Sequence, residues 1–247
     1  MEEKITMNIA IIIAGGVGSR TGQHIPKQFI NVYDKPIIVY TLEKFQVHKE
    51  IDAIEVVCLK GWEEVLQTYA RQYGIAKLKW IVPGGGSSQE SIYKGLVNLK
   101  NRCRDDDIVV IHDGIRPMVE EKVISSCISS CRKYGNGITA LPIYEQIFKV
   151  LDEKSTDSYI PRETLRILQT PQAYRYWKLL NVYEEGYKKK NGMHASAYAN
   201  TLMTDLGYIL YFSAGSTKNI KITTKDDIEI FKAMLKKAEY GEKNDDL

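Results

Sequence analysis

The sequence predicts an α/β fold in which a mostly parallel sheet is covered by helices on both faces. Asn8–Ala14 (NIAIIIA) is an unbroken, mainly β-branched run, typical of a strand buried on both sides, and it leads directly into a glycine-rich loop. Similar runs alternate with helical patterns through the following half of the chain. Because such alternation is typical of strands joined by crossover helices, we expect these strands to lie parallel in one sheet.

The elements follow in order. After the first strand we expect further strands at residues 53–59, 78–82, 108–112 and 137–141, with helices at 37–45, 61–73 and 92–99. Beyond the middle of the chain we expect a helix at 176–189, a strand at 208–212 and a terminal helix at 225–240. Thr223 and Thr224 precede this last helix and are candidates for its N-cap.

Residues 142–161 do not follow the strand and helix alternation. Ile147 and Val150 are followed by a polar stretch at 152–158, a pattern that favours a hairpin or an arm. An arm of this kind often reaches a partner subunit. We therefore expect one domain, residues 1–247, with a dimerisation arm at about 142–161.

Composition excludes several classes of protein. The 34 basic and 31 acidic residues are dispersed and give a net charge of +3, so the basic patch of a nucleic-acid-binding protein is missing and a small anionic ligand fits better. The four cysteines lack the spacing of a zinc site. Neither a signal-peptide pattern nor a stretch of membrane-spanning length is present, so we expect a cytoplasmic protein without a membrane partner.

The first candidate site is the glycine loop after the opening strand. Its small residues can offer backbone N–H groups to phosphate oxygens: Ala14, Gly15, Gly16 and Gly18. Arg20 and Lys27 follow closely and could neutralise a triphosphate and the charge that develops during its reaction. The loop matches neither the Walker pattern nor GxGxxG. The alternative is a tight turn with two solvated cations.

The second candidate lies in the segment IVVIHDGIRP. Asp113 ends an expected strand, where open α/β sheets bind ligands, and could hold Mg²⁺ against phosphates while Arg116 faces the phosphate of a second substrate. The alternative is a helix N-cap followed by a surface arginine. His112 is left out of the site, because a lone histidine beside a buried strand is more often structural.

A second glycine loop and a late lysine complete the candidates. Bare backbone at Gly84, Gly85 and Gly86 could pass close to a nucleobase, and Ser91 could bind the base or cap the following helix. Lys221 stands in a β-like run, where a charge needs either an edge position or an anionic ligand, and we favour the ligand.

Six motifs in this order, AGGVGSR, PKQF, the GGG loop with its serine, HDGIRP, LQTPQAYR and NIKITTKDD, resemble the 2-C-methyl-D-erythritol 4-phosphate cytidylyltransferases and the related ribitol-5-phosphate cytidylyltransferases. The resemblance extends over nearly the whole chain. It implies a Rossmann-like domain, a β-arm that interlocks two subunits, and Mg²⁺-bound CTP as co-substrate. A polyol phosphate would attack the α-phosphate and release pyrophosphate.

The resemblance also implies residue roles. Arg20, Lys27 and Lys221 would stabilise the transition state, and Asp113 would bind the metal. The two glycine segments and Ser91 would hold the cytidine. Arg116 and Arg162 would grip the polyol phosphate, with Arg162 supplied across the dimer by the arm. Such a set of cations, metal and backbone donors is chemically sufficient for this class of transfer.

The chain departs from the family pattern at three places. Ser87-Ser88 replaces a loop arginine, for which Lys94 or Lys218 could compensate, Glu145-Gln146 replaces Asp-Thr in the arm, and Ala197-Tyr198-Ala199 replaces a Thr-Asp segment. The last two lie where the family contacts its acceptor, and Gln146 or Tyr198 could reach different hydroxyl groups. We therefore favour ribitol, glycerol or a related alditol phosphate for a surface polymer over methylerythritol phosphate of isoprenoid synthesis. Two alternatives remain, a sugar-1-phosphate nucleotidyltransferase and a non-catalytic nucleotide-binding protein.

Overall fold

A seven-stranded sheet forms the centre of the protein, in the order β11-β7-β10-β6-β1-β4-β5. The computed structural model describes residues 6–16, 25–188 and 198–242. The strands of the sheet are β1 (Asn8–Ala14), β4 (Ala53–Cys58), β5 (Leu78–Pro83), β6 (Ile108–Asp113), β7 (Asn136–Pro142), β10 (Arg166–Arg175) and β11 (Phe212–Ala214). The β1, β4, β5 and β6 strands pair in parallel, and β10 runs antiparallel to both of its neighbours. The predicted mostly parallel sheet is confirmed.

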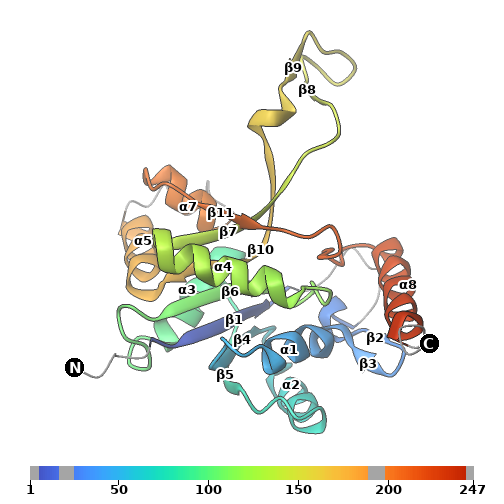
Figure 1. Ribbon diagram of the computed structural model, residues 1–247. Helices are drawn as coiled ribbons and strands as arrows, with labels where there is room; N and C mark the ends of the chain where they lie inside the picture. The colour runs from blue at the N-terminus through green and yellow to red at the C-terminus, as the bar shows by residue number, and fades with distance from the viewer. Residues whose placement is uncertain (1–5, 17–24, 189–197, 243–247) are drawn as a thin grey trace.

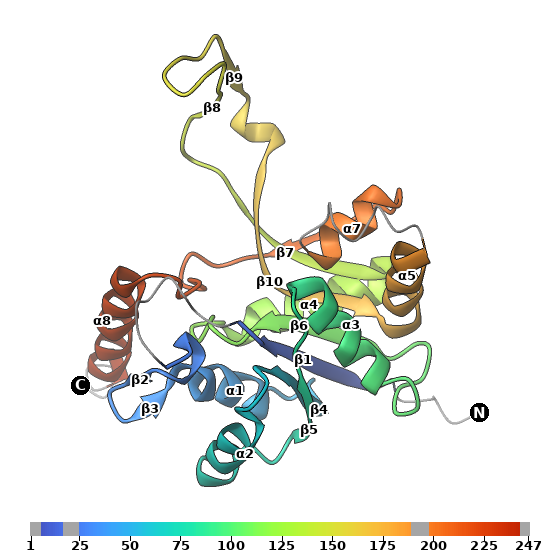
Figure 2. The same cartoon turned by 180° about the vertical axis from the view of Figure 1, so that it is seen from behind.

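Helices cover both faces of this sheet (Figures 1 and 2). One apolar core packs α1 (Ile37–Val47), α2 (Glu63–Gln72) and α4 (Glu121–Tyr134) against alternate residues of β1 such as Ala10 and Ile12. The other packs α3 (Ser88–Asn98), α5 (Tyr176–Lys188) and α7 (Ala199–Asp205) against Ile9 and Ile11. The continuous apolar run of β1 is thus explained, because both of its faces are buried.

A third, smaller cluster lies under the C-terminal helix α8 (Lys225–Glu242), which packs beside β2 (Asn31–Val32) and β3 (Lys35–Pro36). The start of α8 is fixed by Asp227, whose carboxylate accepts hydrogen bonds from the backbone N–H groups of Thr223 and Thr224 at 2.8 Å. The backbone N–H of Asp227 donates in turn to the Thr224 hydroxyl. The predicted cap is confirmed. No helix within the described ranges has the length and apolar character needed to cross a membrane.

The arm is a hairpin that projects away from the sheet (Figure 1). It contains β8 (Ile147–Lys149), β9 (Ser158–Ile160) and a short 3-10 helix at Arg162–Thr164, and it joins β7 to β10. Several of its apolar side chains are exposed, among them Phe148, Val150 and Tyr159. The predicted hairpin at about 142–161 is therefore confirmed as a structural element, extended to the start of β10.

Two predicted boundaries are wrong. The strand expected at 208–212 is β11, which begins only at Phe212. Before it, the Asn136 side chain bonds the backbone of Ile209 and Tyr211 in place of a regular ladder. The helix expected at 92–99 begins at Ser88, since the Ser87 hydroxyl caps it by accepting from the Glu90 N–H. Ser91 therefore lies inside α3 and does not cap it.

Candidate active site

A cleft of about 310 Å³ opens where β1 and β6 end. The chain passes from β1 to β4 and β5 on one side and returns to β6 on the other, so this is the point at which the strand order reverses. Open α/β sheets bind ligands at such a point, outside the carboxyl ends of the strands. Its lining includes Ala14, Gly16, Lys27, Ser88, Asp113, Thr170, Gln172, Tyr198, Ala199 and Lys221.

The base of the first glycine loop is held by Gln28. Its buried side-chain amide donates hydrogen bonds to the carbonyl oxygens of Ala14 at 2.7 Å and Gly16 at 3.0 Å. Gln28 belongs to the short 3-10 helix Lys27–Phe29, so the same bonds place Lys27 at the edge of the cleft. Gln28 had no predicted role, although it stands within the PKQF motif. Gly18 and Arg20 lie outside the described residues.

The two glycine segments meet beside the cleft. A Cβ atom on Gly84 would lie 3.3 Å from the Gly15 Cα and 3.1 Å from the Cys58 carbonyl oxygen, closer than ordinary contact. Ser91 lies below both segments, and its hydroxyl accepts a hydrogen bond from the Gly85 N–H at 3.0 Å. Gly86 donates to Glu90 at 2.8 Å. A side chain at position 84 would thus press against the neighbouring backbone, because the two glycine segments approach so closely there.

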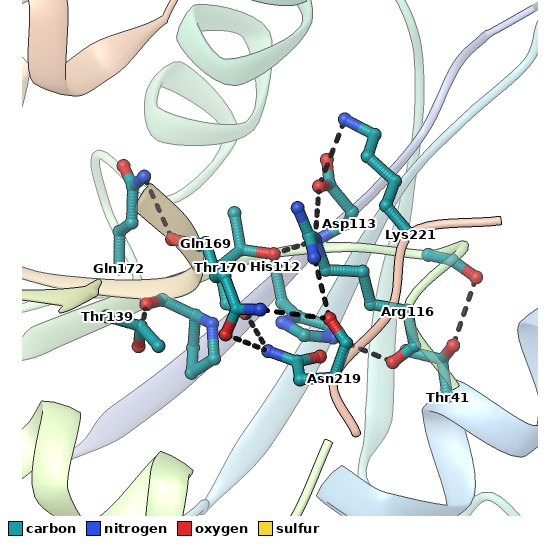
Figure 3. Close-up of polar contacts among 12 residues, drawn as sticks. Thr41, His112, Asp113, Arg116, Thr139, Gln169, Thr170, Gln172, Asn219 and Lys221 are labelled. Carbon is teal, nitrogen blue, oxygen red and sulfur yellow. Dashed lines mark hydrogen bonds and ion pairs between the residues drawn. The ribbon is translucent and has the colours of Figure 1, made fainter. Parts of the chain in front are cut away.

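Asp113 is the electrostatic centre of the cleft (Figure 3). Its Oδ2 atom lies 3.1 Å from Lys221 Nζ and 3.0 Å from Arg116 Nε. Burial alone would raise the pKa of this carboxyl, but Lys221 and Arg116 outweigh it and hold the pKa below its ordinary value. Asp113 ends β6 while α4 begins only at Glu121, which excludes the helix-cap interpretation.

Arg116 and Asp113 are held by a network of amides and a hydroxyl that the sequence did not predict (Figure 3). Arg116 donates to the Asn219 carbonyl oxygen at 2.7 Å, and the Asn219 side chain donates to the Thr170 carbonyl oxygen at 2.7 Å. Gln169 also donates to the Asn219 carbonyl, and the Asp113 N–H donates to the Thr170 hydroxyl at 3.1 Å. The LQTPQ and NIK motifs therefore form one support for Asp113 and Arg116.

The segment around Lys221 is not a strand. Residues 215–224 form no strand, which excludes the edge-strand alternative, and the contact of Lys221 with an anionic ligand stays a prediction. Its partner in the structure is Asp113. The side chain of Arg116 is only 11% exposed and does not line the cleft, because it is directed at Asp113 and Asn219. The role of Arg116 as an acceptor ligand stays a prediction.

The opposite wall of the cleft comes from α3 and α7. Ser88 and Ile92 line it from α3, while Tyr198 and Ala199 line it from the start of α7. Neither lysine that could replace the missing loop arginine lines this space. Lys94 pairs with Glu90 at 3.0 Å and donates to the Gly84 carbonyl oxygen, and Lys218 is directed at Glu120.

The two predicted arm residues lie apart from this cleft within one chain. Arg162 donates to the Tyr144 carbonyl oxygen at 2.7 Å, and its side chain is about half exposed. Gln146 and Arg162 line a separate hollow of the arm together with Phe148 and Tyr159. A role for either residue in the cleft therefore requires the arm of another subunit.

His112 is structural, as its omission from the site implies. The ring is fully buried, packs against Phe45 with centroids 5.0 Å apart and contacts the Arg116 carbonyl oxygen at 3.1 Å. Burial lowers the pKa of His112 to about 4, so the imidazole is neutral near pH 7.

The side chains at the cleft fit a divalent cation such as Mg²⁺ that is bound partly by the protein and partly by the phosphates of a ligand. Within the described ranges no group of three or more acidic, histidine or cysteine side chains could hold a metal without a ligand. Mg²⁺, however, is commonly bound by one or two carboxylates together with substrate phosphates and water, and Asp113 supplies an ionised carboxylate at the cleft. Lysine and backbone N–H groups around it suit a polyphosphate.

Comparisons with known proteins agree with this geometry. The sequence profile of the 2-C-methyl-D-erythritol 4-phosphate cytidylyltransferase family matches residues 8–237. A ribitol-5-phosphate cytidylyltransferase from Lacticaseibacillus paracasei is 53% identical over 94% of this chain and 100% of its own length. A 2-C-methyl-D-erythritol 4-phosphate cytidylyltransferase from Clostridium botulinum is 36% identical over 94% of this chain and 99% of its own. The crystal structure of 4-diphosphocytidyl-2C-methyl-D-erythritol synthase from Anaerococcus prevotii superposes with a TM-score of 0.77 and 26% identity, covering 94% and 99% of the two chains.

Proposed function

Because this chain belongs to the 2-C-methyl-D-erythritol 4-phosphate cytidylyltransferase family, we propose that it is a CTP-dependent cytidylyltransferase whose acceptor is ribitol 5-phosphate. The observation that carries the class of reaction is the cleft at β1 and β6, where Asp113, Lys221 and Lys27 converge beside two glycine segments. The acceptor rests on the 53% identity to a ribitol-5-phosphate cytidylyltransferase, against 36% for a methylerythritol-phosphate relative.

In the proposed reaction a phosphate oxygen of the acceptor attacks the α-phosphorus of CTP, and the bond to the β-phosphate breaks. The CDP-polyol forms and pyrophosphate leaves with the electron pair of the broken bond. Lys27, Lys221 and Arg20 neutralise the charge that spreads over the phosphate oxygens, and backbone N–H groups of residues 14–18 orient the triphosphate. The segment at 84–86 with Ser91 holds the cytidine. None of these steps requires a covalent enzyme intermediate.

A divalent cation fits this scheme through Asp113. When bound, Mg²⁺ would neutralise the triphosphate and hold it in one geometry. Lys221 already contacts the Asp113 Oδ2 atom at 3.1 Å and Arg116 the same atom at 3.0 Å, so the carboxylate is kept ionised and aimed at the cleft. We infer that Arg116 serves mainly to hold Asp113, in addition to the acceptor contact that the resemblance implies.

The arm supplies the second half of the acceptor site in this proposal. We infer that residues 1–247 form one domain and that two copies pair through their arms, which carries Arg162 and Gln146 to the partner's cleft. The exposed Phe148, Val150 and Tyr159 support this inference, because exposed apolar groups of this size commonly pack against another subunit.

We further propose a cytoplasmic location, where CTP is available.

A second candidate acceptor is 2-C-methyl-D-erythritol 4-phosphate, since the family profile and the superposed structure carry that name. Tyr198 and Ala199, in place of the family's Thr-Asp segment, line the cleft and argue against it. Pyrophosphate release with Mg²⁺ and CTP, UTP, ATP or GTP against ribitol, glycerol and methylerythritol phosphates would test both. We expect turnover with CTP and ribitol 5-phosphate; preference for another nucleotide would contradict the proposed function.

A further inference from the structure

A buried glutamine joins α3 and α7, the two helices that form the opposite wall of the cleft. Gln89 lies in the first turn of α3 and is only 2% exposed. Its Nε2 atom donates a hydrogen bond to the Tyr198 carbonyl oxygen at 2.9 Å, 109 residues away in the sequence. The hydroxyl of Tyr183 in α5 donates to its Oε1 atom. One side chain thus joins three helices.

The orientation of this amide follows from its partners. A carbonyl oxygen can only accept, so the NH₂ group of Gln89 must face Tyr198, and the amide oxygen is left for Tyr183. Tyr183 is fully buried and packs near Tyr93 of α3, with ring centroids 6.1 Å apart. The amide therefore has one orientation in which both partners are satisfied.

The two ends of this connection both reach the cleft. On α3, the neighbouring Ser88 lines the cleft, and Ser91 accepts from the N–H of Gly85 in the glycine loop. On α7, Tyr198 is the N-cap residue and lines the cleft together with Ala199. The Tyr198 carbonyl oxygen also accepts from Leu202 and Thr201, so the bond from Gln89 anchors the whole first turn of α7.

We propose that Gln89 is a positioning residue that sets the place of Tyr198 and the first turn of α7, and thereby the fit of the polyol phosphate. The proposal rests on the proposed function, because it takes the Tyr198 wall as the acceptor side of the cleft. Gln89 itself stays behind the lining and contacts no substrate. Its loss should therefore act on the acceptor more than on CTP.

Gln89→Met tests this, because methionine keeps the length and volume of the side chain but can make neither hydrogen bond. We expect the KM for ribitol 5-phosphate to rise about tenfold, from the loss of one or two buried hydrogen bonds, with the KM for CTP changed less than about twofold. Tyr183→Phe removes only the bond that orients the amide and should raise the same KM about threefold. Gln67→Met, the same substitution at an exposed position of α2, is the matched control and should change neither constant.

The outcomes separate the two levels of the account. An unchanged ribitol 5-phosphate KM in Gln89→Met, or equal rises for both substrates, would overturn the positioning role while wild-type turnover still supports the proposed function. Wild-type protein that releases no pyrophosphate with any polyol phosphate would overturn both. Thermal melting establishes that each variant is folded; if Gln89→Met does not fold, the ribitol 5-phosphate KM of Tyr183→Phe decides, and no change there counts against the proposal.

Discussion

The cleft and the arm both carry charged residues assigned to one reaction, yet the chain holds them in different ways. Asp113 is contacted by two cations, and the carbonyl oxygen of the buried Asn219 holds one of them, Arg116. Arg162 bonds only local groups among its described contacts and is about half exposed. In the same arm, Val150 is 76% and Tyr159 70% exposed.

The difference shows which part of the site a single chain can organise. In the cleft, contacts within the chain fix Asp113 and Arg116 before a ligand arrives, which is the preorganisation that phosphoryl-type transfer needs. In the arm, neither the apolar nor the charged side chains have that support. We infer that one subunit organises Asp113 and Arg116 by itself, whereas the arm becomes part of a site only against a second copy.

The largest expected effect is at the cleft. Lys221→Ala should lower kcat by about 10²–10³-fold, because it removes a positioned charge that stabilises the transition state. Lys218→Ala is the matched control, since Lys218 lies three residues earlier, is exposed and pairs with Glu120 outside the cleft. Steady-state kinetics with saturating CTP measures both. Equal losses in the two variants would show that the charge of the segment, and not its position, matters.

The arm should have a smaller effect that depends on the partner. Arg162→Ala should lower kcat/KM for the acceptor by about 10–100-fold, as expected for a lost charged hydrogen bond. When the Arg162→Ala and Lys221→Ala proteins are mixed and re-equilibrated, the mixture should recover about a quarter of wild-type activity. Half of the dimers are then mixed, and in each of these one of the two sites combines an intact Lys221 with an intact Arg162. Absence of recovery, with mixed dimers present by native mass spectrometry, would mean that arm and cleft act within one chain.

A third prediction compares buried and exposed carboxyl groups. Glu55 of β4 is fully buried, with a hydrogen bond from Asn98 at 2.6 Å, and burial raises the pKa of Glu55 from 4.5 to about 7 despite that bond. The folded chain therefore keeps a proton that the unfolded chain releases, so stability falls as pH rises from about 4.5 to about 7, by roughly 3 kcal/mol, and then levels off.

Glu55→Gln should remove this pH dependence and be more stable than wild type above pH 7. Glu153→Gln, at an exposed arm position, should leave the pH dependence of stability unchanged. Urea unfolding at pH 5 and pH 8 measures both. If the difference in free energy of unfolding between wild type and Glu55→Gln is the same at both pH values, the Glu55 carboxyl is ionised in the folded protein throughout this range.

The smallest expected effect concerns single neutral hydrogen bonds. Asn219→Ala leaves the Thr170 carbonyl oxygen without its donor in a buried position and should cost about 1–3 kcal/mol of stability. Thr156→Ala removes a hydroxyl that donates to the Lys149 carbonyl oxygen in the exposed arm. Water can replace this donor, so the loss should cost less than about 1 kcal/mol of stability. Denaturant unfolding measures both; equal costs would argue against a rigid support behind the cleft.

The parallel core was predictable from the sequence, because strands that are buried on both faces have continuous apolar sequences. The antiparallel β10 was not, since its centre is the polar Leu168 to Gln172 segment, whose amides serve Asn219 and the cleft instead of an apolar core. The backbone just before β11 is bonded by the side chain of Asn136, a contact between residues about 75 positions apart. Local patterns contain no trace of such contacts.

The charged members of the site could be found from the sequence because their motifs follow strand ends and glycine loops. The residues that support them could not. Gln28, Gln89 and Asn219 are uncharged amides, and each acts through a backbone carbonyl oxygen brought near by the fold. The sequence showed only that these three residues stand within the motifs of the family, and it did not indicate what each side chain does.

The most direct test of the account is the product formed from CTP, Mg²⁺ and ribitol 5-phosphate, followed by phosphorus NMR together with pyrophosphate release. We predict CDP-ribitol and pyrophosphate in equal amounts, with a kcat/KM for ribitol 5-phosphate at least about tenfold above that for 2-C-methyl-D-erythritol 4-phosphate. A higher kcat/KM for the methylerythritol substrate would contradict the assigned acceptor. Pyrophosphate without a CDP-polyol would contradict cytidylyl transfer itself.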